Sequence, residues 1–462
     1  MDLTKQKMGR DMHMWYDEAS FYHIYPLGLC QAPFENTGGE TVHALPNLLP
    51  WLDHIKEMGC DALYIGPLFE SETHGYDTID YKQVDRRLGD NDDFVSFVQY
   101  AHQNGIRVVV DGVFNHTGRR HRAFTDIREK RENSAYRWWY KGVNFDWNSV
   151  YNDGFSYESW RNCQDLVCLN LQNEEVRQYL FDIARFWIHT FDIDGIRLDC
   201  ADCLDFRFME DLRGVVTHEK PDFWLMGEVI HGDYARWANE RMLHSVTNYE
   251  LHKGLYSGHN DHNYFEIAHT IRRQFDENGG IYRGRTLYSF VDNHDVSRIV
   301  DKLSDQAHLK SVYALLYTLP GLPSVYYGSE WGIHGRKEDG DRALRPGIDL
   351  AAISANPPVP GLYEWIRTLG RIRKGHAALR LGRYRQLMLT NRQYAFARIC
   401  DAETVVILVN NDDQEAEFHV PLPWAPASLQ ELTGDETSEA DGACLHARLQ
   451  RGEAKIYLLE SH

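Results

Sequence analysis

The sequence predicts an α/β protein built on a closed barrel of eight parallel strands, the (β/α)8 or TIM barrel. Eight short apolar runs alternate with helical patterns before residue 330, which is typical of repeated βα units and a parallel sheet. At 462 residues the chain can hold such a barrel and a further domain. After about residue 376 the pattern changes to short strands and turn clusters, which predicts a small antiparallel β domain.

Each barrel strand is expected where a short apolar run ends at a glycine or a polar residue. The third run is apolar at several consecutive positions, as in strands that are buried on both faces. A helix is predicted before it, over residues 92–104, because Phe94 and Phe97 fall on one face. Gly105 then follows as a typical helix stop. The eight expected strands span residues 21–25, 62–65, 106–110, 195–198, 223–226, 245–249, 287–291 and 323–327.

The stretch between the third and fourth strands is too long for an ordinary βα loop. About 70 residues there show no clear periodicity, which predicts an inserted subdomain or lid. Aromatic residues make up 13% of the chain and are frequent in this stretch. Because sugars present flat apolar faces, aromatic side chains around a cleft suit a carbohydrate, although most such rings serve packing. The stretch contains Trp138, Trp139, Trp147, Tyr157 and Trp160.

Charge and composition exclude several classes of partner. With 49 Lys+Arg against 68 Asp+Glu the net charge is −19, which argues against nucleic acids and anionic membranes and suits a neutral substrate. No run of 18 apolar residues appears, and the N-terminus has no signal-peptide pattern. The eight cysteines are scattered, and Cys200-Ala-Asp-Cys203 is a single CxxC without the second pair of a typical metal site. We therefore expect a cytoplasmic protein without a membrane partner.

Acidic residues stand at the carboxyl ends of four expected strands, where barrel active sites lie. One acid in such a place is often a helix N-cap, but four of them, several beside His or Arg, are hard to explain by capping. Glycoside cleavage needs a nucleophilic or stabilising carboxylate and a proton-donating carboxylic acid, which Asp199, Glu228 and Asp295 can supply. Arg197 points to the same side of its strand as Asp199 and is expected to keep Asp199 ionised. The strand ends read Asp111–His116, Arg197–Asp199, Gly227–Glu228 and Asp292–Asp295.

These segments resemble the four sequence regions of the α-amylase family, family 13 of the glycoside hydrolases. They read DGVFNH, GIRLDCAD, GEVIH and FVDNHD, and the likeness extends to HGYDTIDY after the second strand and GLPSVYYG at the eighth. The motifs occur in the same order over roughly residues 15–375. With this resemblance we expect a barrel over residues 1–116 and 171–375, an inserted domain B over 117–170 and a C-terminal β-sandwich over 376–462.

The resemblance also implies a role for each residue of the candidate site. Asp199 would be the nucleophile, Glu228 the general acid/base and Asp295 the stabiliser of the transition state. The implied substrate is an α-gluco-oligosaccharide, such as a maltodextrin or a cyclodextrin, whose α-1,4 bonds are cleaved with retention. Five further residues would hold this substrate: Tyr76 stacked beneath the sugar, Asp111 supporting the site from below, and Arg197, His116 and His294 in contact with the sugar.

Two departures from the family pattern matter. Calcium-dependent members resemble this chain at Asn115, but they carry an acidic ligand in domain B and a His soon after the nucleophile. Here the corresponding stretches, Leu166–Asn170 and Asp199–Cys203, contain cysteines, which are poor ligands for calcium. No metal and no cofactor are therefore expected, and calcium at the shared site is doubtful. The GEVIH segment looks most like the neopullulanase, cyclomaltodextrinase and maltogenic amylase branch, but without its usual N-terminal β domain.

Two other functions stay open at this point. The same covalent intermediate serves glucosyl transfer, including isomerisation or phosphorolysis of a disaccharide, because only the acceptor differs. A catalytically inactive binding protein on this barrel would have lost at least one of the three acids, and all three are present. The sequence sets neither the preferred linkage nor the oligomeric state, and it allows a homo-oligomer.

Overall fold

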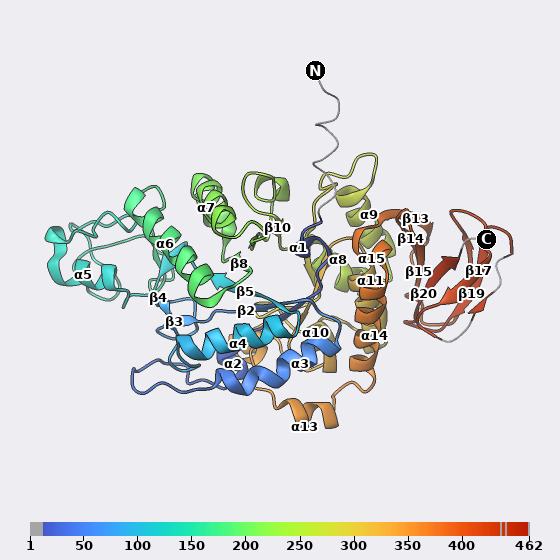
Figure 1. Ribbon diagram of the computed structural model, residues 1–462, viewed down its shortest axis with the longest axis horizontal. Coiled ribbons are helices and arrows are strands. Elements are labelled where there is room, and N and C mark those ends of the chain that lie inside the picture. Colours follow the sequence, from blue (N-terminus) through green and yellow to red (C-terminus); the bar gives the residue numbers. More distant parts are fainter. Residues whose placement is uncertain (1–12, 435–436, 439–440, 461–462) are drawn as a thin grey trace, which may run out of the picture.

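The centre of the computed structural model, which describes residues 13–434, 437–438 and 441–460, is a closed barrel of parallel strands (Figure 1). Its strands are β1 (Phe21–Ile24), β2 (Ala62–Ile65), β5 (Arg107–Gly112), β8 (Gly195–Leu198), β9 (Trp224–Gly227), β10 (Ser245–Val246), β11 (Tyr288–Phe290) and β12 (Leu322–Tyr326). They pair in the order β10-β9-β8-β5-β2-β1-β12-β11. The ring closes where the Asn248 N–H donates to the Tyr288 carbonyl, 2.8 Å away.

Every expected strand is present, so the predicted barrel is confirmed. The sixth strand is shorter than predicted, since β10 ends at Val246 and does not reach residue 249. The reason is that Asn248 caps the next helix, α8 (Tyr249–Asn260). Its side chain accepts a hydrogen bond from the Leu251 N–H, which requires the backbone to leave the sheet.

Helices cover the outside of the barrel, as the alternation of patterns predicts. Between β9 and β10, where all residues are described, only the 3-10 turn η5 (Tyr234–Arg236) replaces a helix. Helix α4 lies within one residue of its predicted bounds and begins with a capping box between Asp90 and Asp93. The longer helices are α3 (Leu49–Glu57), α4 (Asn91–Gln103), α6 (Glu174–Phe191), α7 (Phe206–Glu219), α8, α9 (Tyr264–Phe275), α11 (Leu309–Thr318) and α14 (Leu362–Gly375). The shorter ones are α1 (Trp15–Glu18), α2 (Pro26–Leu29), α10 (Ile299–Lys302), α12 (Asp341–Leu344), α13 (Leu350–Ala355) and α15 (Ala377–Leu381).

The barrel is filled by side chains rather than open. Inward-facing residues from several strands pack in one cluster, in which Phe21 of β1 stacks on Trp224 of β9 with ring centroids 4.8 Å apart. The alternate positions, such as Tyr22 and Ile24, face outward into the layer between strands and helices. Polar residues at the strand ends therefore stand on a densely packed base.

The residues between β5 and α6 form a lobe at one end of the long axis, coloured teal in Figure 1. The lobe is joined to the barrel by β6 (His116–Thr117), which pairs with β7 (Val167–Cys168). It also contains helix α5 (Arg122–Lys130), which was not predicted. That helix has only nine residues and three buried side chains, too few for a recognisable helical period. A second antiparallel pair, β3 (Phe69–Ser71) and β4 (Thr78–Val84), follows β2.

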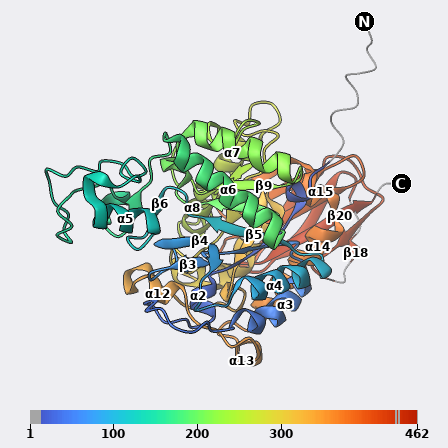
Figure 2. The same cartoon turned by 60° about the vertical axis from the view of Figure 1, so that its left-hand side comes forward.

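The last part of the chain forms an antiparallel β-sandwich at the opposite end of the molecule (Figures 1 and 2). Its strands are β13 (Arg383–Leu389), β14 (Gln393–Ile399), β15 (Thr404–Asn410), β16 (Ala416–Pro421), β17 (Ser428–Glu431), β18 (Thr437–Ser438), β19 (Cys444–Leu449) and β20 (Ala454–Glu460). The sheet β13-β14-β15-β20-β17-β18 shares an apolar core with the pair β16-β19. Arg398 on β14 donates to the carbonyl of Thr318 in α11, 2.6 Å away, and so ties the sandwich to the barrel.

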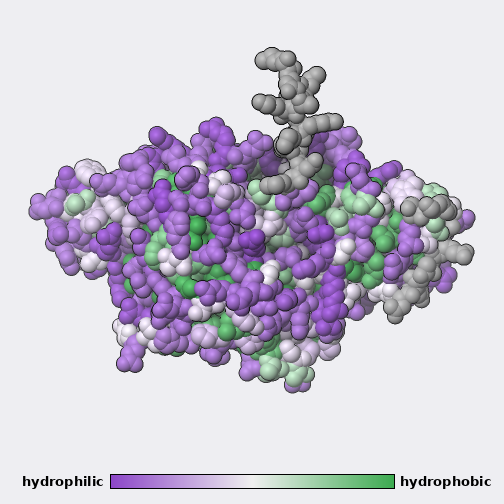
Figure 3. Space-filling view, viewed as in Figure 1, coloured by the Kyte–Doolittle hydropathy of each residue, from purple (hydrophilic) through white to green (hydrophobic). Residues whose placement is uncertain are grey.

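The face of the molecule in Figure 3 is mostly hydrophilic, in keeping with the net charge of −19. Apolar residues appear on this face as scattered patches. In the part of the chain that the structure describes, no helix is both long enough and apolar enough to cross a membrane.

Candidate active site

The acids expected in the site all lie at the carboxyl ends of barrel strands. Asp111 stands near the end of β5, and Asp199 directly follows β8. Glu228 directly follows β9, and Asp295 lies in the loop after β11. In a parallel barrel these strand ends form one face, on which active sites are built. The structure therefore brings the three candidate catalytic acids and Asp111 to the same end of the barrel.

One buried arginine holds three of these carboxylates together. The side chain of Arg197 is 3% exposed, and its Nη1 lies 2.8 Å from Oδ1 of Asp111 and 2.8 Å from Oδ1 of Asp199. Its Nη2 lies 2.9 Å from Oε2 of Glu228. Arg197 and Asp199 reach the same side because side chains two residues apart on a strand share a face. The guanidinium thus bridges the two principal acids of the site.

Asp295 is joined to this cluster through an imidazole and a phenol. Nε2 of His294 lies 3.0 Å from Oδ2 of Asp295 and 2.5 Å from the hydroxyl of Tyr76. That hydroxyl donates to Oδ2 of Asp111, 3.1 Å away. The rings of Tyr76 and His294 are nearly parallel, with centroids 5.6 Å apart. A continuous series of polar contacts therefore runs from Asp111 to Asp295.

His116 lies beside Asp199 at the start of the inserted lobe. Its Nε2 is 3.1 Å from the carbonyl oxygen of Tyr76. Ligand atoms of His116, Asp199 and Cys200 all lie within 4.8 Å of one another. Burial lowers the pKa of His116 to about 4, so the ring is neutral at pH 7. The ring of Trp160, in the same lobe, lies 6.1 Å from that of His116.

Two of the acids have opposite pKa shifts. Burial raises the pKa of Asp199 well above its ordinary value, and Arg197 opposes this only in part. Arg197 lowers the pKa of Asp199, in the expected direction, but the same guanidinium also binds two other carboxylates. That Asp199 is ionised in the reactive complex stays a prediction. Burial would also raise the pKa of Asp295, but His294 and Arg345 outweigh it and hold that pKa well below its ordinary value.

Three residues of the site were not predicted. Nη2 of Arg345 lies 2.9 Å from Oδ1 of Asp295, and its guanidinium stands over the ring of Tyr25 at 4.7 Å. Tyr64 donates to Oδ2 of Asp111, 2.7 Å away. The two tyrosines lie on or directly after barrel strands, so the strand alternation could have indicated them. Arg345 directly follows the short helix α12, and no motif points to it.

The donors at the family's shared calcium position do not fit calcium. Nδ2 of Asn115 faces the sulfur of Cys168 at 4.0 Å, and Cys203 lies in the turn that follows the Asp199 strand. Calcium takes six to eight oxygen ligands, whereas thiols select softer ions. We therefore derive no step through calcium. Among the described residues, one buried trio could hold a softer ion: His116, Asp199 and Cys200.

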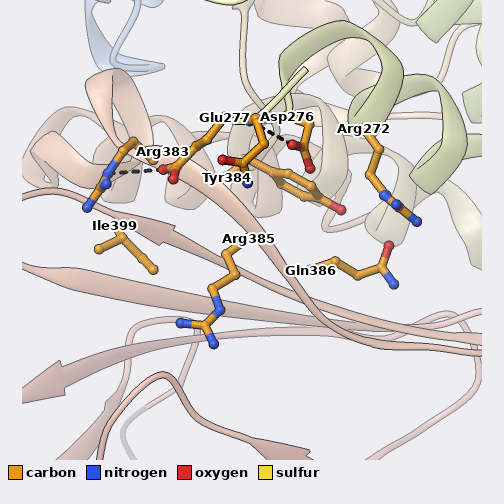
Figure 4. A pocket seen from close by; sticks show the side chains of 9 residues that line it. Arg272, Asp276, Glu277, Arg383, Tyr384, Arg385, Gln386 and Ile399 are labelled. Carbon is orange, nitrogen blue, oxygen red and sulfur yellow. Dashed lines mark hydrogen bonds and ion pairs between the residues drawn. The ribbon is translucent and has the colours of Figure 1, made fainter. Parts of the chain in front are cut away.

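A cavity of about 450 Å³ lies away from these acids, between the end of α9 and strand β13 (Figure 4). Its lining carries charges of both signs, including an ion pair of 3.1 Å between Arg383 and Glu277. None of the candidate catalytic acids lines it, so we do not assign it to the reaction.

The paired carboxylates on the ligand-binding face of the barrel define the class of the protein as a (β/α)8-barrel glycoside hydrolase. The chain matches the alpha-amylase catalytic domain over residues 24–357 and belongs to the alpha-amylase family. This confirms the resemblance seen in the sequence motifs.

The chain is similar to several characterised members of that family. It is 30% identical over 429 residues to a cyclomaltodextrinase of Bacillus sp, covering 86% of this chain and 73% of the relative. It is 30% identical over 459 residues to neopullulanase 2 of Thermoactinomyces vulgaris, covering 93% and 75%. The solved structure of a cyclomaltodextrinase matches with a TM-score of 0.86 at 26% identity, covering 96% of this chain and 78% of that one. These names belong to the branch that the GEVIH segment resembles.

Proposed function

We propose that the protein hydrolyses α-1,4-glucosidic bonds in maltodextrins, cyclodextrins or related gluco-oligosaccharides with retention of configuration. The observation that carries this proposal is the bridge that Arg197 makes between Asp199 and Glu228. It places a nucleophile and a proton donor within reach of one glycosidic bond, as double displacement requires. Similarity to proteins named cyclomaltodextrinase and neopullulanase supports the substrate class.

In the first half of the proposed reaction Asp199 attacks the anomeric carbon while Glu228 protonates the departing oxygen. Positive charge develops on the sugar ring as the bond breaks. Asp295 faces that charge as an anion, because His294 and Arg345 hold its pKa low. Electrostatic stabilisation of this kind is strong because the donors and charges are already in place.

For this step, one member of the buried pair Asp199 and Glu228 must be protonated and the other ionised. Both bind Arg197, and burial favours the protonated form of Asp199 in the free enzyme. In the reactive complex that proton must reside on Glu228, because only then are a nucleophile and an acid present together. Once the glycosyl group is attached to Asp199, Glu228 is left as a carboxylate and can accept a proton from the attacking water.

The remaining residues of the cluster are suited to hold a sugar ring. We assign Tyr76 as the aromatic platform beneath it, and His116 and His294 as partners for its hydroxyl groups. Neutral His116 can both donate and accept a hydrogen bond. Asp111 binds Arg197 and the Tyr76 hydroxyl, and so orients the groups that would contact the substrate.

The conditions of action are part of the proposal. We propose that the enzyme works in the cytoplasm and without calcium. All eight cysteines are free in the structure, which suits a reducing compartment. The thiols at the family's calcium position support the absence of a calcium requirement.

Chromatography of the products from maltotriose, a cyclodextrin, pullulan and isomaltose, with and without phosphate, tests the proposal. We expect short maltosaccharides from maltotriose and the cyclodextrin, independent of phosphate, and the α anomer first by NMR. The Asp199→Asn variant should lose this activity, whereas Asp202→Asn, an exposed acid three residues later, should keep it. Sugar phosphates or rearranged disaccharides would indicate phosphorolysis or transfer instead. A β anomer would rule out double displacement.

A further inference from the structure

Two cysteines lie in one turn directly after the proposed nucleophile. Cys200 follows Asp199, and the 3-10 turn η4 (Ala201–Cys203) follows Cys200. The Cys203 N–H donates to the Cys200 carbonyl, 2.8 Å away, which closes a turn between residues i and i+3. The Cα atoms at i and i+3 of such a turn fall within reach of a disulfide.

The two thiols differ in exposure and acidity. Cys200 is 5% exposed, whereas Cys203 is exposed at the surface. Interaction with Cys200 lowers the pKa of Cys203, and interaction with Cys203 together with burial raises the pKa of Cys200 well above its ordinary value. Cys203 is therefore the thiol that ionises and meets reagents from solution.

A small disulfide can reach Cys203 from outside. Cys203 lines a cavity of about 320 Å³ together with Lys141, Asn170 and Asp205. The lining carries one positive charge, Lys141, and one negative charge, Asp205, and Lys141 can attract a carboxylate of a peptide disulfide such as glutathione disulfide. The partner, Cys200, is buried and directly precedes the same turn.

Cys200 is also bound to the catalytic acids. Its backbone N–H donates to Oε2 of Glu228, 3.1 Å away. Its sulfur lies within 4.8 Å of ligand atoms of both His116 and Asp199. Its φ of 37° is in the left-handed region, which a cysteine adopts only when its surroundings hold it there. A change in the conformation of Cys200 would therefore move the groups around the reacting bond.

We propose that Cys200 and Cys203 form a reversible disulfide that switches the enzyme off. The Cys203 thiolate attacks one sulfur of a small disulfide, forms a mixed disulfide and releases one thiolate. Cys200 then gives up its proton and attacks the Cys203 sulfur, which releases the second small thiol. The two protein thiols are oxidised by two electrons, and one small disulfide is reduced to two thiols.

The effect on activity rests on the proposed hydrolytic function, whereas the disulfide itself does not. Joining the sulfurs pulls the Cys200 side chain toward the surface and reorients the N–H that binds Glu228. We expect a loss of at least tenfold in kcat, reversed by dithiothreitol. Cys203 is exposed and is not among the residues to which we assign catalysis or sugar binding, so Cys203→Ser should keep the reduced enzyme's activity.

The experiment incubates the full chain with glutathione disulfide, alkylates the remaining thiols and digests with trypsin. Cleavage after Arg197 and Arg207 gives one peptide with both cysteines, Leu198–Arg207. The switch leaves this peptide without alkyl groups and two hydrogens lighter than its dithiol form. Turnover of maltotriose should fall in parallel and recover with dithiothreitol. Cys163→Ser, which removes another exposed cysteine, should respond like the parent. Cys203→Ser or Cys203→Ala should resist, and Cys200→Ser should retain glutathione at Cys203.

The mass and activity readouts separate the failures of the two proposals. A fully alkylated Leu198–Arg207 peptide, or a cross-link from Cys203 to Cys168 in the peptide Asn162–Arg177, would overturn the switch. So would a complete Cys200–Cys203 disulfide with unchanged turnover. Absence of any product from the reduced parent would contradict the proposed function instead, and the peptide mass would still report on the disulfide.

Discussion

Arg197 donates from Nη1 to the carboxylate of Asp199, 2.8 Å away, although only Leu198 separates the two residues in the chain. The same guanidinium also binds Asp111 and Glu228, so one positive charge is divided among three carboxylates. This explains why the pKa of Asp199 is raised by burial despite the ion pair. The cluster holds fewer positive than negative charges, and that imbalance favours the protonated form of Asp199 in the free enzyme.

Replacing Arg197 with Gln should damage both the fold and the reaction. Breaking a buried ion pair costs about 3–5 kcal/mol, and the free energy of unfolding should fall by that order in urea titrations. Removing the group that lowers the pKa of Asp199 should raise that pKa further. Because Asp199 must be ionised to attack, the acidic limb of the kcat/KM profile should move to higher pH. Arg207→Gln, at an exposed arginine on α7, is the control and should change neither quantity.

Neutralising two acids should shift thermal stability in opposite directions. Asp199 has a raised folded-state pKa, so its charged form costs stability at pH 7, and Asp199→Asn should raise Tm. Asp295 has a lowered folded-state pKa, so its negative charge stabilises the folded protein. This contribution is fully present above the unfolded-state pKa and disappears as the pH falls through the folded-state pKa. Asp295→Asn should therefore lower Tm at pH 7. Scanning calorimetry would contradict these assignments if both variants moved Tm in the same direction.

Replacing each of the two main acids with alanine should change the turnover of different substrates in different ways. Asp199→Ala removes the covalent step, so turnover should fall by roughly 10⁴-fold or more on every substrate. Glu228→Ala removes proton donation, so maltotriose cleavage should collapse while cleavage of α-glucosyl fluoride is largely spared. Azide should then accelerate turnover of Glu228→Ala and yield a glucosyl azide of retained α configuration. The reverse pattern in the two variants would mean that the roles are exchanged.

Chelation should leave the enzyme nearly unchanged. The sulfur of Cys168 faces Asn115 where an oxygen ligand would be needed, so calcium has no adequate donor set there. We expect EDTA to alter neither the initial rate on maltotriose nor Tm. A large loss in either, restored by added calcium and not by magnesium, would show that another calcium site supports the fold.

Trp160 should contribute to substrate binding from the inserted lobe, since its ring lies 6.1 Å from that of His116. An aromatic contact with a sugar contributes about 1.4 kcal/mol, so Trp160→Ala should raise KM for maltotriose about tenfold with a smaller change in kcat. Trp147→Ala is the matched control, because that side chain is 70% exposed in the same lobe. Equal effects of the two substitutions on KM would remove Trp160 from the site.

The eight barrel strands could be predicted because each is a short apolar run, and such local patterns depend on neighbours in the chain. The acids at the strand ends were predictable for the same reason, once parallel strands were assumed to end on one face. Helix α5 and the early end of β10 were not predicted. The first is too short to show a period, and the second depends on the side-chain hydrogen bond that Asn248 makes to the next helix.

The sequence by itself therefore determined the barrel, its family and the candidate acids Asp199, Glu228 and Asp295, because these follow from local patterns and short motifs. Only the tertiary structure decided how their charges are balanced. The division of Arg197 among three carboxylates, and the contact of Arg345 with Asp295 from 50 residues away, depend on packing between distant segments. Desolvation is likewise a property of the folded surroundings, and it sets the pKa of Asp199 above and that of His116 below the ordinary value.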